Sequence, residues 1–289
     1  MVKILVGDNP FLGISHLARE RGREALRGLT LEKKVEVLKA AADEGASGFT
    51  FSTHNANLEL LAYMRDNEKD LLKKLEYYVL TPYAAEYVRL TDVTGTDRLV
   101  KSIVIENLKK NPLKLINAPP YSIINLFIHE NLNPYLEILP KQNVKAVLLH
   151  EVLSEILIAF KLTKIVKELR NYFTRLGVGF GMETRNIAIL SRLLEQSGKT
   201  IEYAMTPMNP LGYQMGTKEE AEKAIIALSS GGVKVIAMNI LASGACTIEE
   251  SAAYLRQYRK HLYAVAFGTS KPERARSNTR CLNIHLNQQ

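Results

Sequence analysis

The feature that most constrains the fold of this chain is a regular alternation of short β-branched runs with longer amphipathic segments. Strands that alternate with helices form parallel βαβ units, because parallel neighbours need a crossover connection between them. Eight such units follow one another, and eight is the number at which this type of sheet closes. We therefore expect one α/β domain over residues 1–289, a (β/α)8 TIM barrel. The predicted strands are Lys3–Gly7, Gly48–Ser52, Tyr77–Thr81, Lys145–His150, Val178–Met182, Ile201–Thr206, Val233–Met238 and Ala264–Phe267.

Two segments, at about residues 11–29 and 111–143, exceed what the barrel needs. The second follows the third predicted helix, so we expect it on the opposite face or the side of the barrel. There it could pack the barrel floor or form a dimer contact, and we favour packing. A doubly wound open sheet is the rival fold, but the first turn, Gly7-Asp8-Asn9-Pro10, contains no G-x-G-x-x-G. The predicted helices are Leu31–Glu44, Asn57–Leu75, Asp97–Lys110, Ser154–Leu176, Ile187–Gln196, one opened by Thr217, Ile248–Lys260, and one from Pro272.

Composition narrows the functional classes. With 46% hydrophobic and 24% charged residues, the chain reads as a globular protein, and no apolar run or leader is long enough for a membrane span or signal peptide. We therefore expect a cytoplasmic protein without a membrane partner, in which Cys246 and Cys281 are free thiols. The net charge is +8, but Lys and Arg are interleaved with acidic residues and no nucleic-acid motif appears. This charge fits a small anionic ligand, or simply solvated lysines, better than a specific nucleic acid.

Polar side chains follow most of the predicted strands. In this barrel the carboxyl ends of the strands carry the ligand site, so these side chains are candidates for function. Asp8, His54, His150 and Glu183 can transfer protons, and we predict them as catalytic acid and base residues. We predict that three further strand-end residues bind substrate: Asn9, Tyr83 and Asn209.

Other chemistries at the same face are less well supported. Two histidines and two carboxylates could bind Zn or Mn. The first strand has no H-x-H motif, however, and the strand ends carry no series of Glu, Asp, His and Glu ligands, so no metal site is predicted. No lysine lies within or just after the first seven strands on the ligand side, which argues against a Schiff-base aldolase. No G-x-S-x-G elbow is present either.

The eighth unit carries the best binding motif. The segment Gly268-Thr269-Ser270-Lys271-Pro272 leads from a strand into a helix, and proline suits the first helical turn. The free N–H groups of that turn, with Ser270 and Lys271, predict an anion site, to which Arg274 and Arg276 add charge. Phosphate sites after the last two strands recur in this fold. An ordinary capped helix with a solvated basic face is the alternative.

Several short motifs of this chain, and their order along the sequence, resemble those of the aldo-keto reductase family. The segment GVKVIAMNILASG at 232–244 is similar to that family's G-I-x-V-x-A-Y-S-P-L-x-x-G, and GTSKPERARSN at 268–278 resembles its G-x-S-x-P-E-R-x-x-x-N. GFTFST at 48–53 resembles the strand that ends in Asp-Thr-Ala, Asn209-Pro210 matches an Asn-Pro after the sixth strand, and His150 falls where the family places its histidine. The resemblance implies the barrel and the phosphate end of a nucleotide site. The positions that we predict to bind a cofactor are Asn239, Gly244, Gly268, Thr269, Ser270, Lys271, Arg274 and Asn278.

The chain departs from that family at the catalytic positions. Of the family's Asp, Tyr, Lys and His, the Asp position reads Ser52, the Tyr position falls near Asn57, and the third strand ends in Thr81 without a lysine. Only His150 is kept. The resemblance therefore does not support carbonyl reduction by the family's mechanism. The pair that would hold the nicotinamide amide reads Glu183-Thr184, and the glutamine of the sixth strand is Met205.

We therefore expect an enzyme that binds a small anionic, phosphate-bearing ligand, with His150 and Glu183 as acid and base. Its reaction class stays open between an isomerase, a lyase and an unusual oxidoreductase. The alternatives are a divergent reductase-like barrel that uses NADP with another proton donor, a non-catalytic binding protein, and a metal-dependent hydrolase or isomerase. The cofactor is not identified, NADP being the first candidate, and a homo-oligomer stays open.

Overall fold

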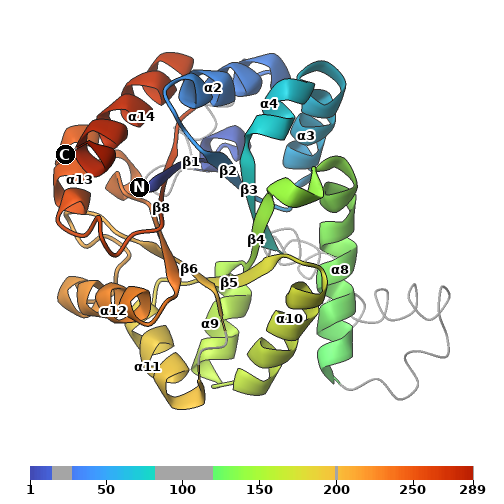
Figure 1. Ribbon diagram of the computed structural model, residues 1–289, viewed down its shortest axis with the longest axis vertical. Coiled ribbons are helices and arrows are strands. Elements are labelled where there is room, and N and C mark those ends of the chain that lie inside the picture. The colour runs from blue at the N-terminus through green and yellow to red at the C-terminus, as the bar shows by residue number, and fades with distance from the viewer. Residues whose placement is uncertain (15–27, 82–119, 199–200, 289) are drawn as a thin grey trace, which may run out of the picture.

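The strands form a closed parallel barrel in the order of the sequence, from β1 to β8, and β8 pairs with β1. The computed structural model describes residues 1–14, 28–81, 120–198 and 201–288. The predicted (β/α)8 barrel is therefore confirmed, and Figure 1 shows its strands surrounded by helices. The strands are β1 Lys3–Gly7, β2 Gly48–Ser52, β3 Glu76–Thr81, β4 Val144–Leu149, β5 Gly179–Glu183, β6 Tyr203–Pro207, β7 Lys234–Met238 and β8 Ala264–Gly268.

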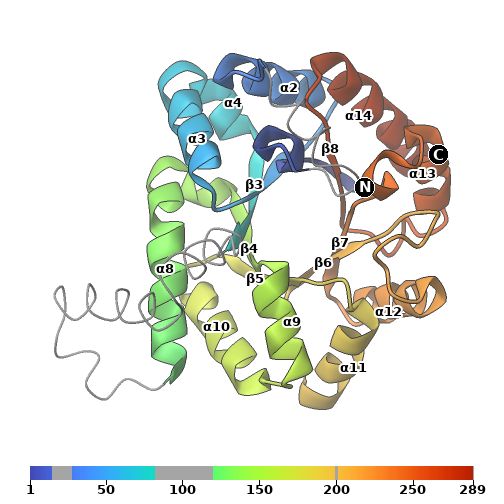
Figure 2. The ribbon, with the colours of Figure 1, turned by 180° about the vertical axis from the view of Figure 1, so that it is seen from behind.

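The helices cover the outside of the barrel, and the same ring is seen from behind in Figure 2. Within the described ranges, none of them is long and apolar enough to cross a membrane. They are α2 Leu31–Asp43, α3 Asn55–Asn67, α4 Lys69–Lys74, α8 Pro120–Ile138, α9 Glu151–Ala159, α10 Thr163–Arg175, α11 Ile187–Ser197, α12 Lys218–Ser230, α13 Ile248–Arg256 and α14 Pro272–Asn287, with short 3-10 helices η1 Asn9–Leu12, η2 Lys141–Asn143 and η3 Ala242–Gly244.

Two of the predicted helices are interrupted in the structure. The segment Asn57–Leu75 forms α3 and α4, which meet at Glu68, where the backbone leaves the helical region (φ −139°, ψ 46°). The segment Ser154–Leu176 forms α9 and α10, and Lys161 between them has a φ of 51°. Neither break lies at a glycine or proline, so the sequence pattern carries no stop signal there.

The predicted extra segment at 111–143 is mostly a helix of the outer ring. In both ribbon views α8 lies between α3 and α10, and it contacts both helices as well as β3. It therefore packs on the side of the barrel, one of the two expected positions, and the expectation that it packs the barrel floor is wrong. The predicted helix at 97–110 and residues 15–27 of the other extra segment lie outside the described residues.

The amino end of the barrel is filled by aromatic side chains. The rings of Tyr78, Tyr203 and Tyr263 contact one another, with centroids 5.5–6.4 Å apart. Their hydroxyl groups join charged side chains: the Tyr78 hydroxyl donates to Glu76 Oε2 (2.9 Å), and Lys234 Nζ donates to the Tyr203 hydroxyl (3.1 Å). We call the three tyrosines the tyrosine floor. Because it occupies the amino end, the carboxyl ends of the strands are left for a ligand.

We predict that Gly181→Ala destabilises the protein by about 1–3 kcal/mol, because overpacking a barrel interior forces shifts. A Cβ at Gly181 would lie 2.6 Å from the Tyr203 carbonyl oxygen and 2.7 Å from Tyr203 Cβ. The control is Gly7→Ala, also in a barrel strand, where the nearest atom would be 3.6 Å away. Urea unfolding measures both variants, and equal unfolding free energies would contradict the packing described.

Candidate functional site

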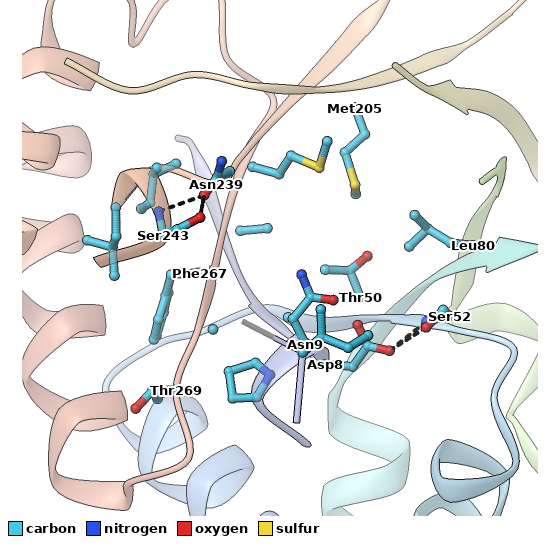
Figure 3. Close-up of a pocket in the computed structure, with 18 of the residues that line it drawn as sticks. Asp8, Asn9, Thr50, Ser52, Leu80, Met205, Asn239, Ser243, Phe267 and Thr269 are labelled. Atoms are coloured by element: carbon cyan, nitrogen blue, oxygen red, sulfur yellow. Dashed lines mark hydrogen bonds between the residues drawn. The ribbon is translucent and has the colours of Figure 1, made fainter. Parts of the chain in front are cut away.

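A pocket of about 580 Å³ lies at the carboxyl ends of the strands. Figure 3 shows that its labelled side chains come from several strands and their loops. The structure brings most of the predicted site residues together there, although their roles in binding and catalysis stay predictions. Those that line the pocket are Asp8, Asn9, His150, Glu183, Asn239, Gly244, Gly268, Thr269, Ser270, Arg274 and Asn278.

Two of the predicted residues serve local structure instead of lining this pocket. His54 is the N-cap of α3, and its Nδ1 accepts a hydrogen bond from the Ala56 N–H (3.1 Å). Asn209 is fully buried, and its side chain accepts from the Tyr213 N–H (2.8 Å) and donates to the Tyr213 carbonyl oxygen (2.9 Å). The geometry therefore gives neither of them a place against a ligand in this pocket.

Two others also fall outside the lining residues. Lys271 is exposed at the N-cap of α14, and its backbone takes part in the turn: its N–H donates to Thr269 Oγ1 (3.2 Å) and its carbonyl oxygen accepts from the Ala275 N–H (3.0 Å). Tyr83 lies outside the described residues. Arg276, expected to add charge to the anion site, instead pairs with Glu44 (3.5 Å) on the outer surface.

The carboxylate of Asp8 is the most heavily hydrogen-bonded group of the site. Its Oδ2 accepts from the Ser52 N–H (2.8 Å), the Ser52 hydroxyl (2.7 Å) and Asn57 Nδ2 (2.7 Å), as Figure 3 shows for Ser52. Burial raises the pKa of Asp8, and the hydrogen bonds from Ser52 and Asn57 oppose that rise. Ser52 and Asn57, two of the positions at which the chain departs from the reductase pattern, therefore both donate hydrogen bonds to Asp8.

Glu183, at the end of β5, is a buried carboxyl group. Its pKa is raised from 4.5 to about 8, first by burial and then by the charges of Glu151 and Asp8, while the hydrogen bond from the Glu151 N–H and the charge of Arg185 oppose the rise. Its Oε2 accepts a hydrogen bond from the Glu151 N–H (3.1 Å). At pH 7 this side chain carries a proton, so it can act as an acid toward a ligand in the pocket.

His150 stands at the N-cap position of α9, with no capping hydrogen bond from its side chain, and lines the pocket together with Glu183 of the neighbouring strand β5. Burial lowers the pKa of its imidazole, while the charges of Glu151 and Asp8 oppose that change. A neutral imidazole at pH 7 can accept a proton. Glu183 and His150 thus have the opposite protonation states that an acid and a base need, with the carboxyl group protonated and the imidazole neutral.

An ion pair beside Glu183 had no role assigned from the sequence. Arg185 Nε lies 2.9 Å from Glu151 Oε1, and both side chains line the pocket. Their positions directly after β5 and β4 were the only sequence signal. Glu155 of α9 holds the loop that carries Arg185, by accepting from the Thr184 hydroxyl (2.7 Å), the Arg185 N–H (3.0 Å) and Asn186 Nδ2 (2.7 Å).

The loop after β7 has an unusual backbone. Asn239 and Ser243 have φ values of 48° and 60°, and Gln214, which faces them, has 61°. Asn239 links these loops, since its Oδ1 accepts from the Ser243 N–H (2.9 Å, Figure 3) and its Nδ2 donates to Gln214 Oε1 (2.9 Å). Left-handed non-glycine residues cost conformational energy and cluster at ligand sites. All three side chains line the pocket, and Gln214 and Ser243 were missed by the sequence analysis.

The opposite end of the pocket is formed by α14. Ser270, Arg274 and Asn278 line it, and no side chain caps the first turn of this helix. The geometry is compatible with the predicted anion site, because uncapped N–H groups and an arginine lie at one end of the pocket. In the described part of the chain, the pocket included, no group of three or more His, Cys, Asp or Glu side chains is placed to hold a metal ion.

Solved structures share this architecture at low sequence identity. A protein of Pseudomonas aeruginosa described as an aldo-keto reductase matches over 98% of this chain and 91% of its own, with a TM-score of 0.61 and 13% identity. The chain has the aldo-keto reductase fold. A glycerol dehydrogenase of Gluconobacter oxydans gives a TM-score of 0.55 and 11% identity over 96% and 85% of the two chains. A mutant of the Gox0644 protein in complex with NADPH gives a TM-score of 0.50 and 12% identity, over 96% of this chain and 83% of its own. No family model and no curated protein matches the sequence.

The raised pKa of Glu183 predicts a pH dependence of stability. The folded state keeps a proton that the unfolded state loses above pH 4.5, so the unfolding free energy falls as pH rises from 4.5 to about 8. We expect Glu183→Gln to remove this contribution, which is worth about 1.4 kcal/mol per pH unit at most. Urea unfolding from pH 5 to 8 should therefore give a flatter curve for the variant.

Glu219→Gln is the control for that measurement. Glu219 is exposed and pairs with Lys223, which lowers its pKa, so its titration lies below this pH window. The control curve should run parallel to that of the unmodified protein. A Glu183→Gln curve that also ran parallel would contradict the buried, protonated state.

Proposed function

We propose that this protein is an oxidoreductase that uses NADP(H) and replaces the family's proton donor with Glu183. The observation that carries the proposal is the continuity of the pocket. One cavity joins the Arg274 and Asn278 end to the Glu183 and His150 end. A dinucleotide has a phosphate-rich end and a reacting end, and such a ligand fits a pocket with an anion-binding end and an acid–base end.

The residues present fit this cofactor at its phosphate end. The uncapped first turn of α14 with Ser270 and Arg274 suits a phosphate group, and Asn278 one turn further along suits a base or ribose. At the other end, the family's Ser-Asn pair is replaced. Thr184 is turned away, because its hydroxyl donates to Glu155. A Glu183 carboxyl oxygen can accept from an amide N–H in their place, which leaves the carboxyl O–H for the substrate.

The chemistry that the chain itself supplies is proton transfer. A reduced nicotinamide, when bound, supplies the hydride that adds to a carbonyl carbon. Glu183 donates its proton to the carbonyl oxygen, becomes a carboxylate, and takes a proton back from solvent. Hydride and proton together convert the carbonyl compound to an alcohol. Glu183 can do this at pH 7 because its pKa of about 8 keeps it protonated.

A second function is favoured by the pairing of Glu183 with His150. An acid and a neutral base on neighbouring strands can move a proton between two atoms of a substrate without any redox step. The protein would then be an isomerase or lyase whose small substrate carries a phosphate at the α14 end. Stabilisation by sugar phosphates but not by NADPH, measured by thermal shift, would favour this function over the first.

The proposed cofactor site predicts that substitutions of two arginines of the same helix, α14, have different effects on NADPH binding. We expect NADPH to bind, as measured by fluorescence titration, and Arg274→Ala to weaken binding about tenfold or more, since it removes a charged partner of a phosphate. Arg276→Ala is the matched control, because Arg276 pairs with Glu44 outside the pocket. Absence of NADPH binding by the folded protein would overturn the redox proposal.

The proposed proton donor predicts a pH profile. The kcat/KM of NADPH-dependent carbonyl reduction, assayed over aldehydes, ketones and 2-oxo acids, should fall as pH rises through about 8, where Glu183 loses its proton. Glu183→Gln should lower the rate about 100-fold or more and abolish that limb. Glu219→Gln should keep both the rate and the limb. If the fall in kcat/KM above pH 8 remained in Glu183→Gln, the proton donor would be a group other than Glu183.

A further inference from the structure

The reacting end of the pocket contains a cation with unused hydrogen-bond donors. Arg185 and Arg274 are the Lys or Arg side chains among the described lining residues, and only Arg185 lies beside Glu183. Its Nε faces Glu151, and its side chain is 38% exposed. Its two terminal nitrogens have no hydrogen-bond partner among the residues that the structure describes. The guanidinium group therefore retains the pair of donors that binds a carboxylate in bidentate fashion.

The position of Arg185 is fixed from two sides. Glu155 accepts from the Arg185 N–H and from the side chains on either side of it, Thr184 and Asn186. Glu151 Oε1 lies 2.9 Å from Arg185 Nε and pairs with the guanidinium group by charge, without hydrogen-bond geometry. A donor pair that is fixed before binding loses little conformational entropy when an anion arrives. This arrangement is typical of a subsite that orients a ligand.

The charges around Arg185 favour a monoanion. Glu151 faces it directly and Asp8 acts on the same end of the pocket, whereas Glu183 is protonated at pH 7. A phosphate dianion would be repelled more strongly by these carboxylates than a single carboxylate would. The α14 end, with Arg274, has the uncapped helix turn that suits a phosphate. The two arginines thus suit two different anionic groups.

We infer that the substrate carries a carboxylate, bound by Arg185, next to the carbonyl group that Glu183 protonates. The substrate class is a 2-oxo acid or the corresponding 2-hydroxy acid. Glu183 ends β5, Arg185 lies two residues later in the loop held by Glu155, and both line the pocket, so one short ligand can contact both. The inference rests on the proposed function for its redox step, but the carboxylate subsite can be tested without a cofactor.

The experiment is calorimetric titration with oxamate, a non-reacting analogue of a short 2-oxo acid, with and without saturating NADPH. We expect oxamate to bind and its uncharged ester, methyl oxamate, not to bind. Arg185→Gln should weaken oxamate binding about tenfold or more, and Arg185→Lys should restore it only in part, because lysine lacks the planar donor pair. The matched control is Arg192→Gln, an exposed residue of the following helix outside the pocket lining.

Glu151→Gln supplies a readout in the opposite direction. It removes the negative charge that faces Arg185, so it should tighten oxamate binding, whereas a damaged fold would weaken it. No oxamate binding under either condition, equal binding by Arg185→Gln, or loss of binding through Arg274→Ala instead would overturn the inference. Oxamate binding through Arg185 without any NADPH binding would keep the subsite and remove the oxidoreductase proposal.

Discussion

The buried carboxylate of Asp8 is the group on which the rest of the site depends. Its hydrogen bonds to Ser52 and Asn57 tie β1 to β2 and to α3, on the face where the ligand pocket opens. Its charge also reaches the opposite strands, where it helps to raise the pKa of Glu183 and opposes the lowering at His150. Ser52 and Asn57, which stand where the aldo-keto reductase pattern has aspartate and tyrosine, are therefore part of a connected network centred on the carboxylate of Asp8.

The strands and the closure of the barrel could be predicted from the sequence because they depend on periodicity. Buried runs such as that of β4 differ from amphipathic helices over many residues, so small errors at the ends do not change the fold. The breaks at Glu68 and Lys161 could not be predicted, since no glycine or proline stands there. The position of α8 in the outer ring was also not predicted. The sequence does not show which neighbours a helix packs against, so a helix of the ring could not be distinguished from an inserted segment.

The site was predictable at the level of strand ends but not of side-chain direction. Residues after strands share one face, and that rule placed Asp8, His150 and Glu183 in one pocket. His54 and Asn209 also follow strands, yet their side chains accept hydrogen bonds from nearby backbone N–H groups and do not line the pocket. The Arg185–Glu151 pair depends on two loops meeting in space, and a single sequence carries no signal for that meeting.

The tyrosine floor has a consequence for how such a protein can change over time. Its aromatic contacts and the narrow space beside Gly181 lie at the amino end of the barrel, away from the pocket. Substitutions at the mouth therefore leave these contacts intact, and the barrel can acquire a new proton donor while it remains folded. A chain built this way tolerates the exchange of one chemistry for another, because the residues that keep the scaffold closed are not those that meet the ligand.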